Sequence, residues 1–175
     1  EPSLVTIPAV DGYPLAAKYY RASAPSHALV IINSATAVKQ NYYRRFALYL
    51  NDCGFDVLTY DYRGVGGSAP ETLRGFHARM RDWGQIDFPG VIDWCVNNLP
   101  HERRWVVGHS IGGQILGLAP NNHHVAGLVG VGAQLTWWKL WPKSDHVKLV
   151  ALWYFLMPTV ARVMGYFPSP WFGLG

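Results

Sequence analysis

Four short, mostly apolar runs limit most strongly what this chain can fold into. The runs are residues 28–32, which are apolar without alternation, and residues 55–60, 104–107 and 125–131. Strands that are covered on both faces have this composition, and they occur mainly in parallel sheets. Helical patterns lie between the runs, for example over residues 41–53 and 87–99, where apolar residues recur at helical spacing. The alternation predicts βαβ units around one mostly parallel sheet of buried strands, with ligands bound at the carboxyl ends of those strands.

Local start and stop signals support this α/β interpretation. Residues 4–8 and 15–20 are rich in β-forming side chains, and Asp11-Gly12 between them is a hairpin signal, so they should form an antiparallel edge of the sheet. Asn41 is placed to cap the first helix. Gly54 follows the last apolar residue of that helix, where glycine is common.

A short motif follows the third buried run. It reads Gly108-His109-Ser110-Ile111-Gly112 and matches G-x-S-x-G. In this pattern the serine sits on a sharp turn between a strand and a helix, and the glycines give the backbone room for the turn. Residues 104–107 supply the strand and residues 114–116 supply the helix. Ser110 would then present its hydroxyl at the carboxyl end of the sheet, with His109 packed beside the turn and directed away from the serine.

A second glycine-rich stretch follows the second buried run and reads Asp61-Tyr62-Arg63-Gly64-Val65-Gly66-Gly67-Ser68. Its glycines permit a tight turn, and Ser68 is placed to cap the next helix, so we interpret the stretch as structural. Glycine-rich loops can also hold phosphate, but this one lacks the Lys-Ser/Thr ending of a P-loop. Nucleotide binding is therefore not expected.

The two motifs and the order of the strands closely resemble the α/β-hydrolase superfamily, and more narrowly its bacterial branch of esterase-like and lipase-like serine hydrolases. The resemblance covers about residues 4–134. It implies an α/β-hydrolase fold, a mostly parallel sheet with helices on both faces. It also implies a serine hydrolase that cleaves a carboxylic ester or a similar small-molecule acyl substrate.

The resemblance assigns roles to single residues. Ser110 is the nucleophile, and the Ile111 N–H is one donor of the oxyanion hole, the pair of donors that stabilises the charged intermediate. The second donor should come from the loop after residues 28–32. In most relatives that loop opens with His-Gly, but here it reads Asn33-Ser34-Ala35-Thr36, so we place the donor at Ala35. The G-x-S-x-G motif as a whole is the nucleophile elbow of that fold.

The partners of the serine are harder to find, because the triad of this superfamily follows the order serine, acid, histidine. After Ser110 the chain has one acid, Asp145, and the histidines His123, His124 and His146. Asp145 and His146 are adjacent and outside any predicted strand end, while His123 and His124 precede a strand, so we expect neither pair to complete a triad. Relatives place the acid and histidine after two further strands. We therefore expect the N-terminal part of a longer hydrolase, inactive alone.

Two alternatives stay open. A non-catalytic α/β-hydrolase-like protein would keep the pocket for ligand binding or as an interaction surface, and the missing triad partners favour it if the chain is complete. A peptidase would use the same elbow on amides, and only substrate profiling would separate it from an esterase.

From residue 135 the sequence becomes rich in aromatic residues. We therefore divide the chain into a hydrolase core, residues 1–134, and a cap segment, residues 135–175. Trp137, Trp138 and Trp141 are candidates for an apolar wall over the serine. Ordinary packing is the alternative for these aromatic residues.

A membrane role is weighed for the same cap segment. Docking on a membrane surface is a further alternative for its apolar helix. The longest apolar run, residues 149–160, is broken by Pro158 and falls well short of the roughly 20 residues of a spanning helix, so we do not expect it to cross a membrane. The first residues show no signal peptide, which favours the cytoplasm.

Composition excludes other classes of function. The formal net charge is +4, but the basic residues form no dense run, so nucleic acid is not an expected partner. No spacing of His, Cys and carboxylates suits a metal, so we predict no metal site and no cofactor. Cys53 and Cys95 lie on apolar sides of predicted helices and should be buried thiols. Because only 15% of residues are charged and the sheet would have an open edge, the isolated chain should aggregate readily.

Overall fold

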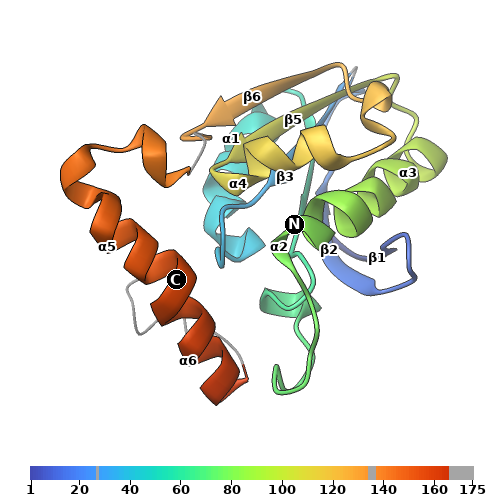
Figure 1. Cartoon of the computed structure of the whole chain (residues 1–175). Coiled ribbons are helices and arrows are strands. Elements are labelled where there is room, and N and C mark those ends of the chain that lie inside the picture. The colour runs from blue at the N-terminus through green and yellow to red at the C-terminus, as the bar shows by residue number, and fades with distance from the viewer. Residues whose placement is uncertain (27, 134–136, 166–175) are drawn as a thin grey trace.

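The structure, a computed structural model, describes residues 1–26, 28–133 and 137–165. Within these ranges the strands form one sheet in the order β1-β2-β4-β3-β5-β6 (Figure 1). The strands are β1 (Ser3–Pro8), β2 (Pro14–Tyr20), β3 (Ala28–Asn33), β4 (Asp56–Tyr60), β5 (Arg103–His109) and β6 (Gly127–Val131). Strands β4, β3, β5 and β6 are parallel, whereas β2 is antiparallel to both β1 and β4. The predicted mostly parallel sheet with an antiparallel N-terminal edge is confirmed.

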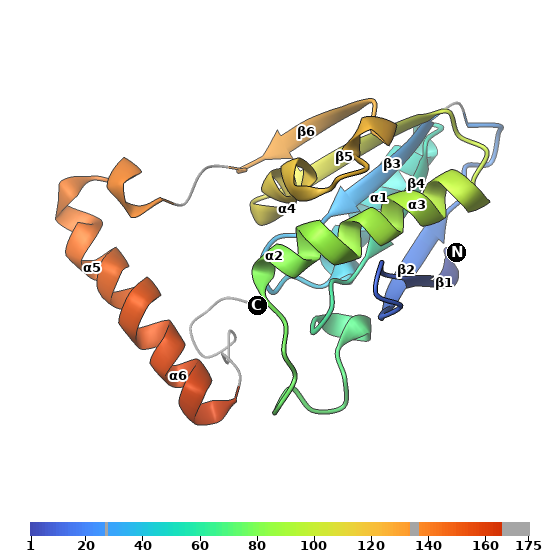
Figure 2. The ribbon, with the colours of Figure 1, turned by 45° about the vertical axis from the view of Figure 1, so that its right-hand side comes forward.

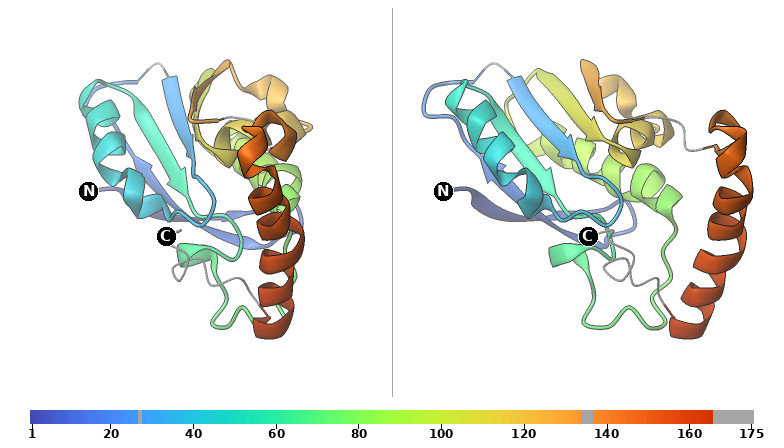
Figure 3. Two further views of the ribbon diagram at one scale, coloured as in Figure 1. Left: turned by 60° about the vertical axis from the view of Figure 1, so that its left-hand side comes forward. Right: turned by 90° about the vertical axis from the view of Figure 1, so that its left-hand side faces the viewer.

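Helices cover both faces of the sheet (Figure 3). One face carries the 3₁₀ turn η1 (Gln40–Tyr43) and α1 (Arg44–Asp52). The other face carries α2 (Met80–Asp82), the π-helical η3 (Trp83–Asp87), α3 (Phe88–Asn98), α4 (Ile111–Gln114) and the 3₁₀ turn η4 (Ile115–Leu118). Two further 3₁₀ turns, η2 (Gly66–Ser68) and η5 (Asn122–His124), lie in the loops.

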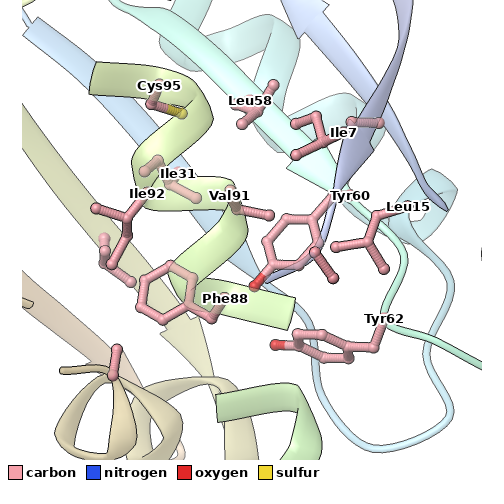
Figure 4. Packing of buried hydrophobic residues seen from close by; sticks show 14 of the residues in the cluster. Ile7, Leu15, Ile31, Leu58, Tyr60, Tyr62, Phe88, Val91, Ile92 and Cys95 are labelled. Atoms are coloured by element: carbon pink, nitrogen blue, oxygen red, sulfur yellow. The ribbon is translucent and has the colours of Figure 1, made fainter. Parts of the chain in front are cut away.

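Alternate side chains of β3 build two cores, one on each face of the sheet. Leu29 and Ile31 belong to the larger cluster, in which Figure 4 shows Phe88 of α3 among the packed side chains. Val30 and Ile32 belong to the smaller cluster on the α1 face. All four side chains are 5% exposed or less. Burial on both faces is what the unbroken apolar run predicted.

Glycines form the two turns at which they were predicted, but the first helix begins at a different residue from the one expected. Gly12 and Gly54 both have positive φ, 82° and 88°, which glycine adopts without a steric penalty. Asn41 does not cap the helix, because the helix already begins as η1 at Gln40 with Lys39 as its N-cap residue. The Asn41 side chain instead accepts a hydrogen bond from Lys18 Nζ.

Hydrogen bonds hold the glycine-rich loop after β4, which supports its structural interpretation. The Asp61 carboxylate accepts the backbone N–H groups of Gln40, at 2.7 Å, and Gly67, at 2.9 Å. Ser68 does not cap a following helix, which corrects the prediction. Its hydroxyl donates to the Asp61 carbonyl at 2.7 Å and accepts the Ala16 N–H at 2.8 Å, so it ties the loop to β2.

The buried Arg63 fastens the same loop to two other parts of the molecule. Its Nε donates to Asp87 Oδ1 at 2.6 Å, and its terminal nitrogens donate to Asp11 at 2.8 and 2.9 Å. The hydrogen bonds from Arg63 lower the pKa of Asp11. For Asp87 burial is the larger influence and raises the pKa, although Arg63 opposes it. The loop is thereby joined to both the β1–β2 turn and the end of η3.

Two burial predictions were wrong. The run at residues 125–131 forms the strand β6, but this strand is largely exposed, with Val129 at 53% and Val131 at 50%, because it is the edge of the sheet. Cys53 is exposed because α1 ends at Asp52 and leaves it at the C-cap position. Cys95 is buried in α3 as predicted, and burial raises the pKa of its thiol to about 12.

The helical segment after β6 is longer than the sequence indicated. The 3₁₀ turn η6 (Trp138–Leu140) precedes a continuous helix, Lys143–Met164, made of η7 (Lys143–Asp145), α5 (His146–Val150), the π-helical η8 (Ala151–Leu156) and α6 (Met157–Met164). Pro158 does not end it, since it follows the wider turns of η8 within the first residues of α6. By length and composition alone this helix of 22 residues is able to cross a membrane, contrary to our expectation.

The open edge leads to a prediction on self-association. We expect Val129→Lys to reduce it, because a lysine on an edge strand opposes pairing with a second edge. Concentration-dependent light scattering measures the effect. Val10→Lys is the matched control, since it adds the same charge at a valine that is 63% exposed in the β1–β2 turn. Equal effects of the two substitutions would show that added charge, and not the edge, controls association.

Candidate active site

Ser110 occupies the sharp turn between β5 and α4. Its φ of 53° and ψ of −119° lie in a region that residues with a side chain seldom adopt. Among the described residues only one other non-glycine residue, Ala37, has a positive φ. The Ser110 N–H donates to the Val131 carbonyl at 2.9 Å, which fixes the turn to the end of β6. This strained conformation at the carboxyl end of an inner strand is the one that the predicted nucleophile elbow requires.

The glycines of the motif are required by close backbone contacts. A Cβ added at Gly108 would lie 2.4 Å from Gly113, and a Cβ added at Gly112 would lie 2.2 Å from the carbonyl oxygen of Asn33. Contacts this short do not occur in folded proteins. The Asn33 side chain also donates to the Gly112 carbonyl at 3.2 Å. The elbow is therefore pressed against the end of β3, where the loop containing Ala35 begins.

A tyrosine hydroxyl accepts the hydrogen bond of the backbone N–H that we expected to bind the oxyanion. The Ala35 N–H donates to Tyr43 Oη at 2.9 Å, and Tyr43 Oη lies 2.9 Å from His109 Nδ1. Burial raises the pKa of Tyr43, so the phenol stays neutral at neutral pH. Ile111 is the first residue of α4, directly after the serine. Ile111 thus lies within the elbow and Ala35 in the loop after β3, but a substrate oxygen would have to replace Tyr43 Oη at Ala35.

Tyr43 was missed from the sequence, although one signal pointed to it. The run Asn41-Tyr42-Tyr43 lies at the start of the first helix, close in sequence to the loop that carries Ala35. The helical pattern accounted for Tyr42 as an apolar position, but Tyr42 is 73% exposed and Tyr43 is buried. The 3₁₀ turn η1 changes the spacing at the start of the helix and directs Tyr43 inward.

Within the described ranges the histidines are either bonded to groups other than the serine or exposed. His109 is bonded to Tyr43, and His146 Nε2 lies 2.9 Å from the Trp141 carbonyl oxygen. His123 and His124 are exposed in η5, before β6, as expected. Within the described ranges no histidine is hydrogen bonded to Ser110.

One histidine does pair with a carboxylate, and the sequence analysis did not find it. The buried His101 Nε2 lies 3.0 Å from Asp56 Oδ2, which also accepts a hydrogen bond from the Tyr19 hydroxyl. His101 precedes β5 and Asp56 begins β4, so this pair lies at the amino ends of the strands. Ser110 lies beyond the carboxyl end of β5, a strand length of roughly 20 Å away. The pair therefore does not serve as the acid and base of Ser110.

A cavity of about 600 Å³ opens at the carboxyl ends of β3 and β4. Its walls are formed by the two loops after these strands, including Val38, Lys39, Tyr42, Val65 and Leu73. An apolar cavity of this size suits a small molecule. The described residues contain no group of three or more His, Cys, Asp or Glu side chains that could hold a metal.

Trp137, Trp138 and Trp141 do not reach the elbow in this structure. Trp137 is 61% and Trp141 is 41% exposed, and Trp138 packs edge-on against His146 at 5.1 Å between ring centroids. Figure 2 shows that the segment stands away from the sheet. Their role as a substrate wall, like the division of the chain at residue 135, stays a prediction, and residues 134–136 lie outside the described part.

Comparison with known proteins decides the family. A family model described as alpha/beta hydrolase fold matches residues 27–169. The chain belongs to this α/β-hydrolase family. No curated protein matches it.

Solved structures agree with this fold. The α/β serine hydrolase without lid XC6422 from Xanthomonas campestris is 21% identical, with a TM-score of 0.60 over 74% of this chain and 60% of that one. The α/β hydrolase GrgF from Penicillium sp. sh18 is 23% identical, with a TM-score of 0.62 over 74% and 45%. The esterase Pf2001 from Pyrococcus furiosus is 23% identical, with a TM-score of 0.56 over 66% and 44%. The chain thus spans only part of the length of these α/β-hydrolase structures.

The close contacts of the elbow lead to a prediction on stability. We expect Gly112→Ala to lower the free energy of unfolding by about 1–3 kcal/mol, because the added methyl group overpacks the elbow against Asn33. Denaturant unfolding measures the change. Gly117→Ala is the control, since a Cβ there meets no atom within 4 Å. Equal stability of the two variants would contradict the assigned contact.

Proposed function

We propose that this α/β-hydrolase is a serine hydrolase that cleaves a carboxylic ester or a similar acyl compound through an acyl-enzyme on Ser110. The observation that carries the proposal is the strained φ of 53° at Ser110, at the carboxyl end of β5. A protein keeps such strain only where the surroundings enforce it, and strained residues cluster at active sites. The close contacts of Gly108 and Gly112 are the surroundings that enforce it here.

In the proposed reaction Ser110 Oγ attacks the substrate carbonyl carbon. A new C–O bond forms, the serine proton passes to a base, and the carbonyl oxygen becomes an oxyanion. The N–H groups of Ile111 and Ala35 would hold that oxyanion, and a donor of this kind contributes roughly 3 to 4 kcal/mol where measured. Collapse of the intermediate breaks the ester bond, and the alcohol leaves with the proton. Water then attacks the carbonyl carbon of the acyl-enzyme, the bond from that carbon to Ser110 Oγ breaks, and the carboxylic acid leaves while the serine regains its proton.

The cavity is the candidate binding site for the acyl or alcohol group, although Ser110 is not among its lining residues. The cavity at the ends of β3 and β4 is bounded by the loop that holds Ala35 and by the loop after β4. Among the described residues that line it, Lys39 is the one charged residue. An apolar acyl chain or alcohol group would remove this wall from water, which favours binding.

The base is the open part of the proposal. Since no histidine within the described ranges is bonded to Ser110, a non-catalytic role is the second candidate. Such a protein would keep the elbow as part of the fold and use the cavity to bind a small ligand. The bonds of His109 to Tyr43 and of His101 to Asp56 favour this alternative, because neither histidine is free to act on the serine.

Reaction with a fluorophosphonate separates the two candidates. The natural protein is incubated with the probe, and the labelled peptide is mapped by mass spectrometry. We expect the label on Ser110, lost in Ser110→Ala and kept in Ser144→Ala, which removes an exposed serine of the cap segment. A folded natural protein without label on Ser110 would refute the hydrolase proposal and leave the ligand-binding role.

A further inference from the structure

The helix Lys143–Met164 carries apolar side chains that nothing in the described structure covers. Its apolar stretch has a mean hydropathy of 1.4, and none of that stretch is buried. Large side chains are exposed along it, with Val147 at 82%, Tyr154 at 63%, Phe155 at 67% and Val163 at 80%. Figures 2 and 3 show the helix standing apart from the sheet. A helix with this composition is stable in an apolar environment rather than in water.

Charge indicates which environment covers it. Residues 137–165 contain four basic residues, Lys139, Lys143, Lys148 and Arg162, against the single acid Asp145, a net charge of +3 out of +4 for the whole chain. All four basic side chains are exposed. A second copy of the same helix would bring like charges together and is disfavoured. A negatively charged apolar surface fits both properties.

The charges also favour a helix that lies on a bilayer over one that spans it. Lys148 lies in the N-terminal part of the helix, and Arg162 lies near its C-terminal end. A spanning helix would carry charged side chains into or across the hydrocarbon region, which is costly. A helix in the interface keeps its lysines among the head groups and its apolar side chains in the acyl region. Trp153 and Tyr154, both exposed, are residue types enriched at that depth.

We propose that residues 137–165 dock on the surface of a bilayer that contains anionic lipids. The segment follows the end of β6, the same end of the sheet at which the Ser110 N–H is bonded to Val131. Docking would therefore place the carboxyl edge of the sheet toward the lipid surface. The proposal does not rest on the hydrolase activity, because binding to lipid needs no reaction at Ser110.

Flotation of the protein with vesicles tests the proposal. Vesicles of phosphatidylcholine alone are compared with vesicles of phosphatidylcholine and phosphatidylserine in a density gradient, in which bound protein rises and aggregated protein sinks. We expect the protein to float with the anionic vesicles and far less with the neutral ones. Replacing Lys139, Lys143 and Lys148 by Gln should weaken binding about 100-fold, since each basic residue near an anionic surface contributes roughly fivefold.

A matched variant controls for net charge. Arg44, Arg45 and Arg103 are exposed on the core, and replacing them by Gln removes the same charge outside the segment. This variant, and Ser110→Ala, should float as the unchanged protein does. Trp153→Ser with Phe155→Ser should weaken binding while leaving all charges in place. Equal flotation with neutral and anionic vesicles, no flotation with either, or equal weakening by both triple variants would overturn the proposal.

Discussion

The contact between Gly112 and the end of β3 is the constraint around which this fold is arranged. A Cβ there would lie 2.2 Å from the Asn33 carbonyl oxygen, so the elbow reaches this position only with glycine. Asn33 in turn donates to the Gly112 carbonyl and accepts the Tyr60 hydroxyl at 2.9 Å. Three neighbouring strands, β5, β3 and β4, are thus joined at their carboxyl ends. The strain at Ser110 is maintained by this junction and not by the turn alone.

Much of this arrangement was predictable because its causes are local in the sequence. The run Ala28 to Ile32 has no polar residue, so both of its faces must be covered, and β3 has a core on each side. The pattern Gly108, Ser110, Gly112 combines two small residues with a serine between a strand and a helix, and it therefore indicated the elbow. The hydrogen-bonded turn formed by Asp61 and the glycines after β4 supports the structural interpretation of that loop, which also forms one wall of the cavity.

The parts that escaped prediction depend on contacts between distant residues. Tyr43 reaches Ala35 because a 3₁₀ turn rotates the start of the first helix, a change that apolar periodicity does not reveal. His101 pairs with Asp56 because the starts of β5 and β4 lie on either side of β3, and the two side chains meet there. The exposure of β6 follows from its position at the edge of the sheet. The sequence does not reveal this position, because β6 is about as apolar as an inner strand. The length of the last helix depends on a π-helical stretch before Pro158.

The hydrogen bond between Ala35 and Tyr43 has a consequence for selectivity under the proposed chemistry. The phenol oxygen is a neutral acceptor that already fills the place of a substrate oxygen. A neutral carbonyl oxygen is an acceptor of comparable strength and has little advantage in replacing it. An oxyanion forms hydrogen bonds roughly twice as strong and displaces it readily. Tyr43 would therefore compete with the substrate for the Ala35 N–H. The neutral carbonyl of the bound substrate does not displace the phenol, whereas the negative charge that develops in the transition state does. The site thus favours the transition state over the ground state.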